Sequence, residues 1–454
     1  MENDDVFTQI TAKLKRVSQS GRDLEMEYEL EDEYESIETS LLEGKSSVDP
    51  GKMGIFATAL FIVGEMTGSG ILGVPQALAY SGYSGFALMF LCVAVATYTG
   101  LTLSRNWMHV RDQYPRCAKP YQCIGNSAFG KCGEVAVQVC ANVTLVGGCC
   151  AYILIAAQSL SRFLFIEFEV DCIGYRTCVA IMALVFLVVI LFGSGGDSLL
   201  VPVLATVLSV TFTLLIIYGI FQTGKSPNFQ PYQVTAKSWF LSFGKFLFAF
   251  GGHSAFPNFQ KEMKKPRDFP GSVIIAFLIK LVLYIPVGIT GMLFFGDCVK
   301  PNILHNIDPQ FKALNACILL LVAVQAIMSA TILGNPVAAM IEGAIGAPHK
   351  QLFSAKRVAV RIGYVAVAIV VCEAIPRFDL IMALIGGTTI NTAVFILPSL
   401  FHIKLAKKDK WLTFKKTLDA LSITFGMGAG IVCTYASVSH IVDEMNIHTA
   451  TFNS

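Results

Sequence analysis

Charged residues are scarce in this sequence. Asp, Glu, Lys and Arg together make up 15 % of its 454 residues, whereas a typical soluble domain has roughly 25 %. Hydrophobic residues make up 54 %, and the mean hydropathy is +0.61. A single soluble domain cannot bury that much apolar surface, so the composition excludes an ordinary soluble protein and predicts a membrane protein.

Two kinds of chemical site are missing as well. The one Gly-x-x-x-x-Gly-Lys-Ser match, "GIFQTGKS" (Gly219–Ser226), falls at the end of an apolar run rather than in a strand-to-helix turn, so it does not predict the phosphate-binding loop that many ATP hydrolases use. Its 13 cysteines show no metal-ligand spacing, and Cys149 and Cys150 are adjacent inside an apolar run. We therefore predict that the protein is not an enzyme, holds no metal or other cofactor, and draws on an ion gradient. We also predict no nucleic-acid partner.

Apolar residues occur in runs of about twenty, which is the length that carries a helix across ~30 Å of hydrocarbon. The predicted fold is therefore an all-α membrane protein with about eleven transmembrane helices. The expected spans are residues 54–80, 84–104, 134–160, 177–193, 198–221, 240–258, 271–295, 313–341, 356–374, 379–402 and 417–442.

The two ends of the chain are polar. Residues 1–52 include the acidic stretch "EMEYELEDEYESIE", a composition that cannot bury a core, and no short cleavable leader precedes the apolar runs. We expect a disordered acidic tail over 1–52, a transmembrane domain over 53–443 and a short tail over 444–454. The short loops on the side of the N-terminal tail, together with the adjoining ends of the spans, hold 19 Lys and Arg, against 8 on the opposite side. This asymmetry predicts a cytosolic N-terminus and a C-terminus that is outside or in a lumen.

Two glycine-rich stretches interrupt the apolar runs. "GEMTGSGILGVP" (Gly64–Pro75) lies in the first span, and "FAFGGHSAFP" (Phe248–Pro257) lies in the sixth. A broken helix in hydrocarbon leaves backbone groups unpaired, so it persists only where it is buried in protein or lines a polar cavity. Breaks five spans apart predict two five-helix units of opposite orientation, with broken helices 1 and 6 and one extra helix.

The breaks predict a site for a zwitterion. Free N–H groups at Gly68–Leu72 suit a carboxylate, and freed carbonyls around Phe250–Gly252 suit an ammonium group. The alternative is that these residues only kink and pack helices. Ser329 and Thr331 of span eight either line a cavity or form hydrogen bonds between helices, and "GGTTIN" in span ten either forms a gate or allows close packing. The candidate substrate-binding residues are Thr67, Gly68, Ser69, Gly70, Phe250, Gly251, Gly252, Ser329 and Thr331.

Three stretches resemble one known family. "GSGILGVPQALAYSGY" looks like the first-span signature of the amino acid/auxin permease family, and "GGHSAFPNFQKEMKKPRDFP" is similar to its sixth-span block, particularly in vacuolar and vesicular amino acid transporters. "NTAVFILPSLFHIKL" (Asn391–Leu405) resembles the end of its tenth span. The resemblance implies a secondary active amino acid transporter, usually proton-coupled and in some branches sodium-coupled, that works by alternating access. We expect small neutral amino acids as substrates.

The coupling ion is predicted from one departure and two titratable residues. Sodium-coupled relatives typically carry Asn where this chain has Gly64, so a sodium site would lack one hard ligand and a proton is favoured. Glu65 lies about 16 Å into the first span, and His253 follows the second double glycine, so both are proton-coupling candidates. Glu65 alternatively pairs with Lys280. Other functions compatible with the sequence are a sodium-coupled neutral amino acid importer and an amino acid sensor with little transport.

Localisation and cross-linking follow from short patterns. Cys172 and Cys298 fall in loops assigned to the non-cytosolic side, where an oxidising lumen would join them, with Cys178 as a competing partner. "YESI" (Tyr34–Ile37) fits the tyrosine-based signals that sorting adaptors bind. We expect a multi-pass protein of an organellar membrane (lysosome, vacuole or vesicle) or of the plasma membrane.

Overall fold

The computed structural model describes residues 53–114, 117, 119–169, 174–192, 200–347, 354–406 and 410–452. The predicted tail over 1–52, its Tyr34–Ile37 pattern and Cys172 lie outside these ranges. Regular structure within them is helical, apart from a single parallel bridge between Met53 and Met263. The main helices are α3 (Ile55–Met66), α4 (Gly68–Ser81), α5 (Ser84–Val110), α6 (Pro120–Phe168), α7 (Tyr175–Phe192), α8 (Leu200–Thr223), α9 (Ala236–Phe250), α10 (Phe256–Lys261), α11 (Phe269–Phe295), α12 (Lys312–Ala344), α13 (Ala355–Ala374), α14 (Phe378–Ile385), α15 (Leu397–Leu405) and α16 (Lys410–Phe452).

The helices occupy the eleven predicted spans. Eight of the described helical segments are long and apolar enough to cross a membrane, and the bent pair α3 and α4 makes a ninth. The pair α9 and α10 lies at the sixth predicted span, where α9 has only 15 residues. Helix α13 lies at the ninth, where Lys356, Arg357, Arg361 and Glu373 lower its hydropathy. Predicted span three, residues 134–160, lies within the longer part of α6, which follows a kink at Phe129 and Gly130; a shorter helical part from Pro120 precedes the kink.

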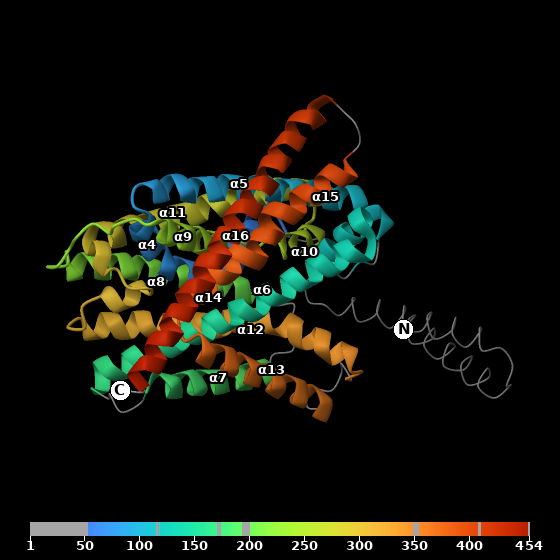
Figure 1. Ribbon diagram of the computed structural model, residues 1–454. Helices are drawn as coiled ribbons and strands as arrows, with labels where there is room; N and C mark the ends of the chain where they lie inside the picture. Colours follow the sequence, from blue (N-terminus) through green and yellow to red (C-terminus); the bar gives the residue numbers. More distant parts are fainter. Residues whose placement is uncertain are drawn as a thin grey trace, which may run out of the picture. The chain divides into compact units, whose positions relative to one another are not determined.

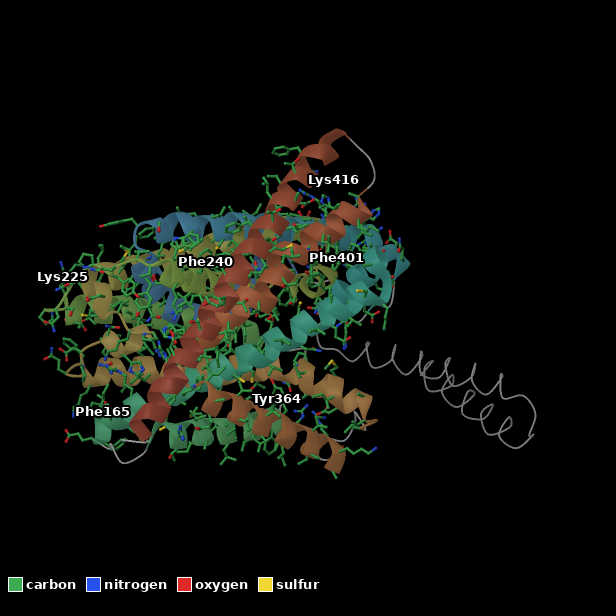
Figure 2. The ribbon with its side chains drawn as sticks, in the orientation of Figure 1. Phe165, Lys225, Phe240, Tyr364, Phe401 and Lys416 are labelled. Atoms are coloured by element: carbon green, nitrogen blue, oxygen red, sulfur yellow. A yellow bond between two sulfur atoms is a disulfide. The ribbon has the colours of Figure 1, made fainter. Side chains whose placement is uncertain are left out.

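Many apolar side chains project outward from the helices, as lipid contact requires. Val282 is 71 % exposed, Val370 68 % and Ile431 68 %, and these residues lie on three different helices. The labelled lysines Lys225 and Lys416 lie toward opposite ends of the bundle (Figure 2). An apolar girdle between polar ends is the surface of a protein that spans a bilayer.

Helices of the two five-helix units pack on each other. The first unit runs from α3 to α8 and the second from α9 to α15, so α6 corresponds to α12, and in the two broken spans α3 corresponds to α9 and α4 to α10. Helix α6 packs along α12, and α4 packs along α9 (Figure 1). Helix α16, which belongs to neither unit, packs against α9, α14 and α15. Between α14 and α15 the chain passes through two π-helical turns, η5 (Gly386–Ile390) and η6 (Thr392–Ile396).

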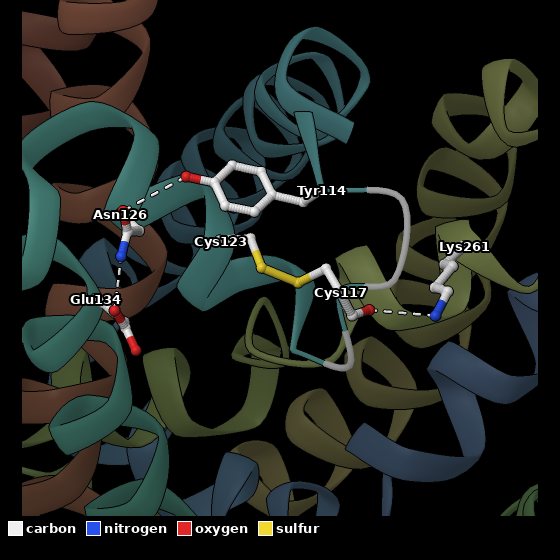
Figure 3. The surroundings of a disulfide bond; sticks show 6 residues. All are labelled: Tyr114, Cys117, Cys123, Asn126, Glu134 and Lys261. Carbon is white, nitrogen blue, oxygen red and sulfur yellow. Dashed lines mark hydrogen bonds between the residues drawn. A yellow bond between two sulfur atoms is a disulfide. The ribbon is translucent and has the colours of Figure 1, made fainter. Parts of the chain in front are cut away.

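The disulfide that the structure contains was not among the predicted pairs. Cys117 and Cys123 are joined at the start of α6, and the Cys117 carbonyl accepts a hydrogen bond from Lys261 Nζ of α10 at 3.2 Å (Figure 3). Cys298 is a free thiol that contacts the Asn228 carbonyl at 3.5 Å. Since Cys172 lies outside the described residues, its pairing with Cys298 stays a prediction that the structure does not support.

A buried ion cluster fastens α12 to α13. The Glu342 carboxylate lies 2.7 Å from Arg361 Nε and 3.7 Å from Arg357 Nε. Arg361 also donates to the Ile190 carbonyl at the end of α7. Because all three charged side chains are buried, each depends on the others for compensation of its lost hydration. The cluster therefore holds the ends of three helices together.

We predict that Glu342→Gln destabilises the protein. Removing one partner of a buried pair costs about 3–5 kcal/mol, because the remaining charges stay buried without compensation. The melting temperature of the purified protein, followed by intrinsic fluorescence, should fall by about 5 °C or more.

Glu373→Gln is the matched control for this prediction. Glu373 pairs with Arg176 at 3.4 Å, but Arg176 is 80 % exposed, and such pairs contribute about 0–1 kcal/mol. An equal melting temperature for the two variants would show that the α12–α13 cluster is not a structural tie.

Candidate functional site

The first predicted break is confirmed at Thr67. Helix α3 ends at Met66, α4 begins at Gly68, and their axes are bent by 65°. Thr67 makes no side-chain cap for α4, because its hydroxyl donates back to the Val63 carbonyl at 2.6 Å. The first N–H groups of α4 therefore have no helical acceptor and no side-chain cap from Thr67. Together they present partial positive charge at the break.

The second predicted break is confirmed at Gly251 and Gly252. Helix α9 ends at Phe250, Gly251 is extended (φ −81°, ψ 139°), and α10 begins at Phe256. The two breaks face each other closely. An added Cβ on Gly70 would lie 2.9 Å from the Ala249 Cα, and an added Cβ on Gly252 would lie 2.5 Å from the Met66 sulfur. Glycine is required at Gly70 because the backbone of the other broken helix occupies the space, whereas a Cβ on Gly252 would require the Met66 side chain to move.

Two side chains of α11 satisfy carbonyls that the breaks release. The Tyr284 hydroxyl lies 3.4 Å from the Met66 carbonyl, 3.3 Å from that of Thr67 and 3.5 Å from that of Ala249. Lys280 is fully buried, and its ammonium group donates to the Ala249 carbonyl. The positive charge also lies over the rings of Phe250 and Tyr284, at 5.2 and 5.3 Å from their centroids.

A cavity of about 80 Å³ lies at the two breaks. It is lined by the last two residues of α3 and the four residues from Gly251 to Ser254, but by only one residue each of α4 and α9. It therefore lies on the α3 and α10 side of the breaks. Its lining residues are Glu65, Met66, Ser69, Thr144, Leu145, Gly148, Tyr152, Phe248, Gly251, Gly252, His253, Ser254, Leu333, Ile390, Ala393 and Val394.

The opposite side of the breaks is closed by a buried charge network. Lys245 Nζ of α9 donates to Gln76 Oε1 of α4 at 2.5 Å and to Asp379 Oδ2 of α14 at 3.2 Å. Arg377 adds two hydrogen bonds to the same carboxylate, each of 3.2 Å. Lys245 is 3 % exposed, Asp379 2 % and Gln76 0 %. The network joins three helices on the side of the breaks away from the cavity.

Few polar groups face the cavity. The Glu65 Oε2 atom is buried and has no hydrogen-bond partner, and the same is true of His253 Nδ1. His253 Nε2 lies 2.9 Å from the Ala96 carbonyl and 3.1 Å from the Thr99 hydroxyl. The Tyr152 hydroxyl lies 3.4 Å from the Ser69 N–H at the start of α4. Carboxylate, imidazole and phenol therefore converge with one helix N-terminus on one small space.

The structure brings part of the predicted site together. Of the predicted residues, Glu65, Ser69, Gly251, Gly252 and His253 line the cavity. Thr67, Gly68, Gly70 and Phe250 are buried beside it and shape the breaks. Ser329 accepts a hydrogen bond from Gln325 at 3.0 Å, and Thr331 donates to Ile327 within α12 at 2.8 Å. These last two side chains bond within their own helix, so these contacts match neither the predicted cavity lining nor the alternative of hydrogen bonds between helices.

The prediction missed several lining residues. Tyr152, Thr144 and Gly148 come from α6, and Leu333 comes from α12. The polar residues of the tenth span pointed to the right region, because the Thr389 hydroxyl lies 2.9 Å from that of Thr144 and Ile390 lines the cavity. No pattern in α6 marked its lining face, because that helix is apolar around most of its circumference over Leu145–Ala157.

Comparisons with known proteins agree with this geometry. The family model described as "Transmembrane amino acid transporter protein" matches residues 51–439. The chain is 25 % identical over 398 residues to "Amino acid transporter AVT1E" of Arabidopsis thaliana, covering 84 % of this chain and 72 % of that one. It is 26 % identical over 399 residues to "Amino acid transporter AVT1B" of the same plant, covering 85 % and 70 %. Its fold resembles that of MhsT, solved in complex with L-phenylalanine, with a TM-score of 0.51 at 13 % identity over 85 % of this chain and 99 % of MhsT.

We predict that Gly68→Ala distorts the site. The added Cβ would lie 2.7 Å from the Tyr152 hydroxyl and would also meet the Gln325 side chain, and overpacking of this kind costs about 1–3 kcal/mol. The melting temperature should fall measurably.

Gly363→Ala is the control, because an added Cβ in the middle of α13 meets nothing within 4 Å. Alanine there should leave stability unchanged or raise it by up to about 1 kcal/mol, through its higher helix propensity. If Gly68→Ala proves as stable as Gly363→Ala, the packing of Tyr152 against the first break is not as described.

Proposed function

This chain belongs to the transmembrane amino acid transporter protein family, and we propose that it is a proton-coupled secondary transporter of small neutral amino acids that works by alternating access. The observation that carries the proposal is the cavity where the two broken helices meet. In inverted-repeat transporters, substrate sites are formed by unwound segments near the middle of the membrane. The named relatives are amino acid transporters, which supports an amino acid as the occupant.

The cavity offers complementary places for the parts of an amino acid. The uncapped start of α4, with the Ser69 N–H and the Tyr152 hydroxyl, suits a carboxylate. Leu145, Leu333, Ile390 and Val394 form an apolar wall that suits an uncharged side chain. A volume of about 80 Å³ favours a small one. These features support small neutral amino acids as the substrate class.

The occupied carbonyls favour a proton over sodium as the coupling ion. Sodium prefers oxygen ligands such as the carbonyls of a broken helix. Here the Ala249 carbonyl already accepts from the Lys280 ammonium group, and Tyr284 lies against those of Met66 and Thr67. Gly64 offers no side-chain oxygen at the position discussed above. Glu65 and His253 remain as groups that can take up a proton at the cavity, so we propose no cofactor other than the transported proton.

Alternating access requires opening the side of the cavity that is closed. That side is closed by the packing of α4 on α9 and by the Lys245, Gln76 and Asp379 network. We propose that these helices separate in the other half of the cycle. The membrane is proposed to be that of an acidic organelle, with the N-terminus in the cytosol, where the tail would be available to sorting adaptors.

We predict that uptake into proteoliposomes depends on a pH gradient and on Glu65. Pooled labelled amino acids should accumulate when the lumen is acidic and sodium is absent, because outward proton movement drives exchange. The gradient-dependent uptake rate of Glu65→Gln should be at least about tenfold lower than that of the native protein, since the amide cannot carry a proton.

Glu134→Gln serves as the control, because Glu134 lies on the exposed first part of α6, beside Lys131 and away from the cavity lining. It should retain the native rate. Uptake that requires sodium would overturn proton coupling, and gradient-dependent uptake that survives in Glu65→Gln would remove Glu65 from the mechanism.

A further inference from the structure

Two buried hydrogen-bond acceptors without a donor belong to residues that line the cavity. One is Glu65 Oε2, from the last turn of α3, and the other is His253 Nδ1, from the second break. Both residues line the same cavity of about 80 Å³. Since native proteins rarely leave buried polar atoms unpaired, this arrangement points to a ligand that brings donors.

The protonation of His253 follows from its other nitrogen. Nε2 lies 2.9 Å from the Ala96 carbonyl, and a carbonyl oxygen can only accept a hydrogen bond. Nε2 therefore carries the hydrogen, and in the neutral ring Nδ1 is a bare acceptor. The ring is held in place by its stacking on Phe256, with centroids 4.6 Å apart. The acceptor at the cavity is thus fixed in both kind and position.

The charge around Glu65 leaves it available to a second cation. Lys280 of α11 attracts the carboxylate electrostatically, but its ammonium group donates to the Ala249 carbonyl instead. Tyr152 of α6 is the other titratable group close enough to interact with it. With His253 these are the titratable groups that face the site from the neighbouring elements. The Oε2 atom remains without a donor.

We propose that Glu65 and His253 form the seat of the substrate's α-ammonium group, and that a proton occupies Glu65 when the ammonium group is absent. An ammonium group supplies positive charge and three N–H donors, which matches one carboxylate and one bare ring nitrogen. The proposal rests on the proposed function, because the ammonium group is that of an amino acid. The sequence predicted that the carbonyls around Phe250 bind the ammonium group. The present proposal assigns this binding to the side chains of Glu65 and His253 instead.

Competition between two cations for one carboxylate produces exchange. Glu65 holds either the proton or the ammonium group, so binding of an amino acid releases the proton. By reciprocity, protons weaken amino acid binding, by up to about tenfold for each pH unit. The amino acid is therefore released where protons are abundant, which directs net movement from the cytosol into an acidic lumen.

The test is proton release on binding. Purified full-length protein in weakly buffered detergent solution, with a pH indicator, is titrated with L-alanine, and binding is followed in parallel by ligand-induced thermal stabilisation. We expect up to about one proton released per alanine bound, and an apparent Kd that weakens as the pH falls. Propionate, which has the same carbon chain and carboxylate but no ammonium group, should neither bind measurably nor release a proton.

Variants separate the two side chains. Glu65→Gln should bind alanine at least about tenfold more weakly, without proton release and without pH dependence. His253→Phe should weaken binding but keep the release, because it removes the acceptor and leaves the carboxylate. Glu134→Gln should match the native protein. The pH dependence of the native Kd needs no variant, so it tests the competition between the proton and the ammonium group even if Glu65→Gln fails to fold.

The contradictory results differ for the two proposals. Alanine binding without proton release, or propionate binding as tight as that of alanine, would overturn the ammonium seat and leave the transport function intact. If no amino acid in a pooled set stabilises the protein at any pH and none is taken up by proteoliposomes, the proposed function fails, and the ammonium seat fails with it.

Discussion

A polypeptide in hydrocarbon must satisfy its backbone polar groups internally, and the arrangement of this protein follows from that constraint. An unpaired N–H or C=O group costs several kcal/mol there, yet α3 and α4 are separated at Thr67 and α9 and α10 at Gly251. Lys280 of α11 donates to the Ala249 carbonyl, and the single Tyr284 hydroxyl hydrogen, from the same helix, lies within reach of the Met66 and Thr67 carbonyls. One helix therefore supplies hydrogen-bond donors to both breaks.

The same constraint separates the paired buried charges from the titratable residues that line the cavity. Lys245 with Asp379, and Arg361 with Glu342, are buried and ion-paired at 3.2 and 2.7 Å, and each pair joins different helices. Their partners compensate the lost hydration, so they act as ties between helices. Glu65 and His253 are different, because they line the cavity and each has one buried atom without a hydrogen-bond partner. Their position at the cavity distinguishes them, since unpaired buried atoms also occur elsewhere, for example Gln76 Nε2 and Ser159 Oγ.

The sequence predicted the features that depend on local chain chemistry. Glycine and proline within an apolar run are incompatible with a continuous helix, so both breaks could be located from residues such as Gly68 and Gly251 alone. Features that depend on helix rotation could not be located in this way. Tyr152 and Leu333 reach the cavity only because of the way α6 and α12 turn toward it. The Cys117–Cys123 disulfide could not be located in this way either, since Cys123 lies on the short helical part of α6 that precedes the predicted span.

The position of the buried charge network also bears on how the cavity would change sides in the proposed transport cycle. Lys245, Gln76 and Asp379 join α4, α9 and α14 on the closed side, while on the α3 and α10 side Met53 pairs with the backbone next to Met263 through hydrogen bonds of 3.4 and 3.0 Å. Removing one ion of the Lys245–Asp379 pair leaves the other buried without compensation, which destabilises the protein by about 3–5 kcal/mol. Separating α9 from α14 instead admits water to both ions, which returns much of their hydration energy. A charge pair across a closing surface therefore holds the closed state firmly but costs less to open than its burial suggests. A ligand shifts such an equilibrium only by the difference between its affinities for the two states, so a closure of this kind lies within reach of the binding energy of one small molecule.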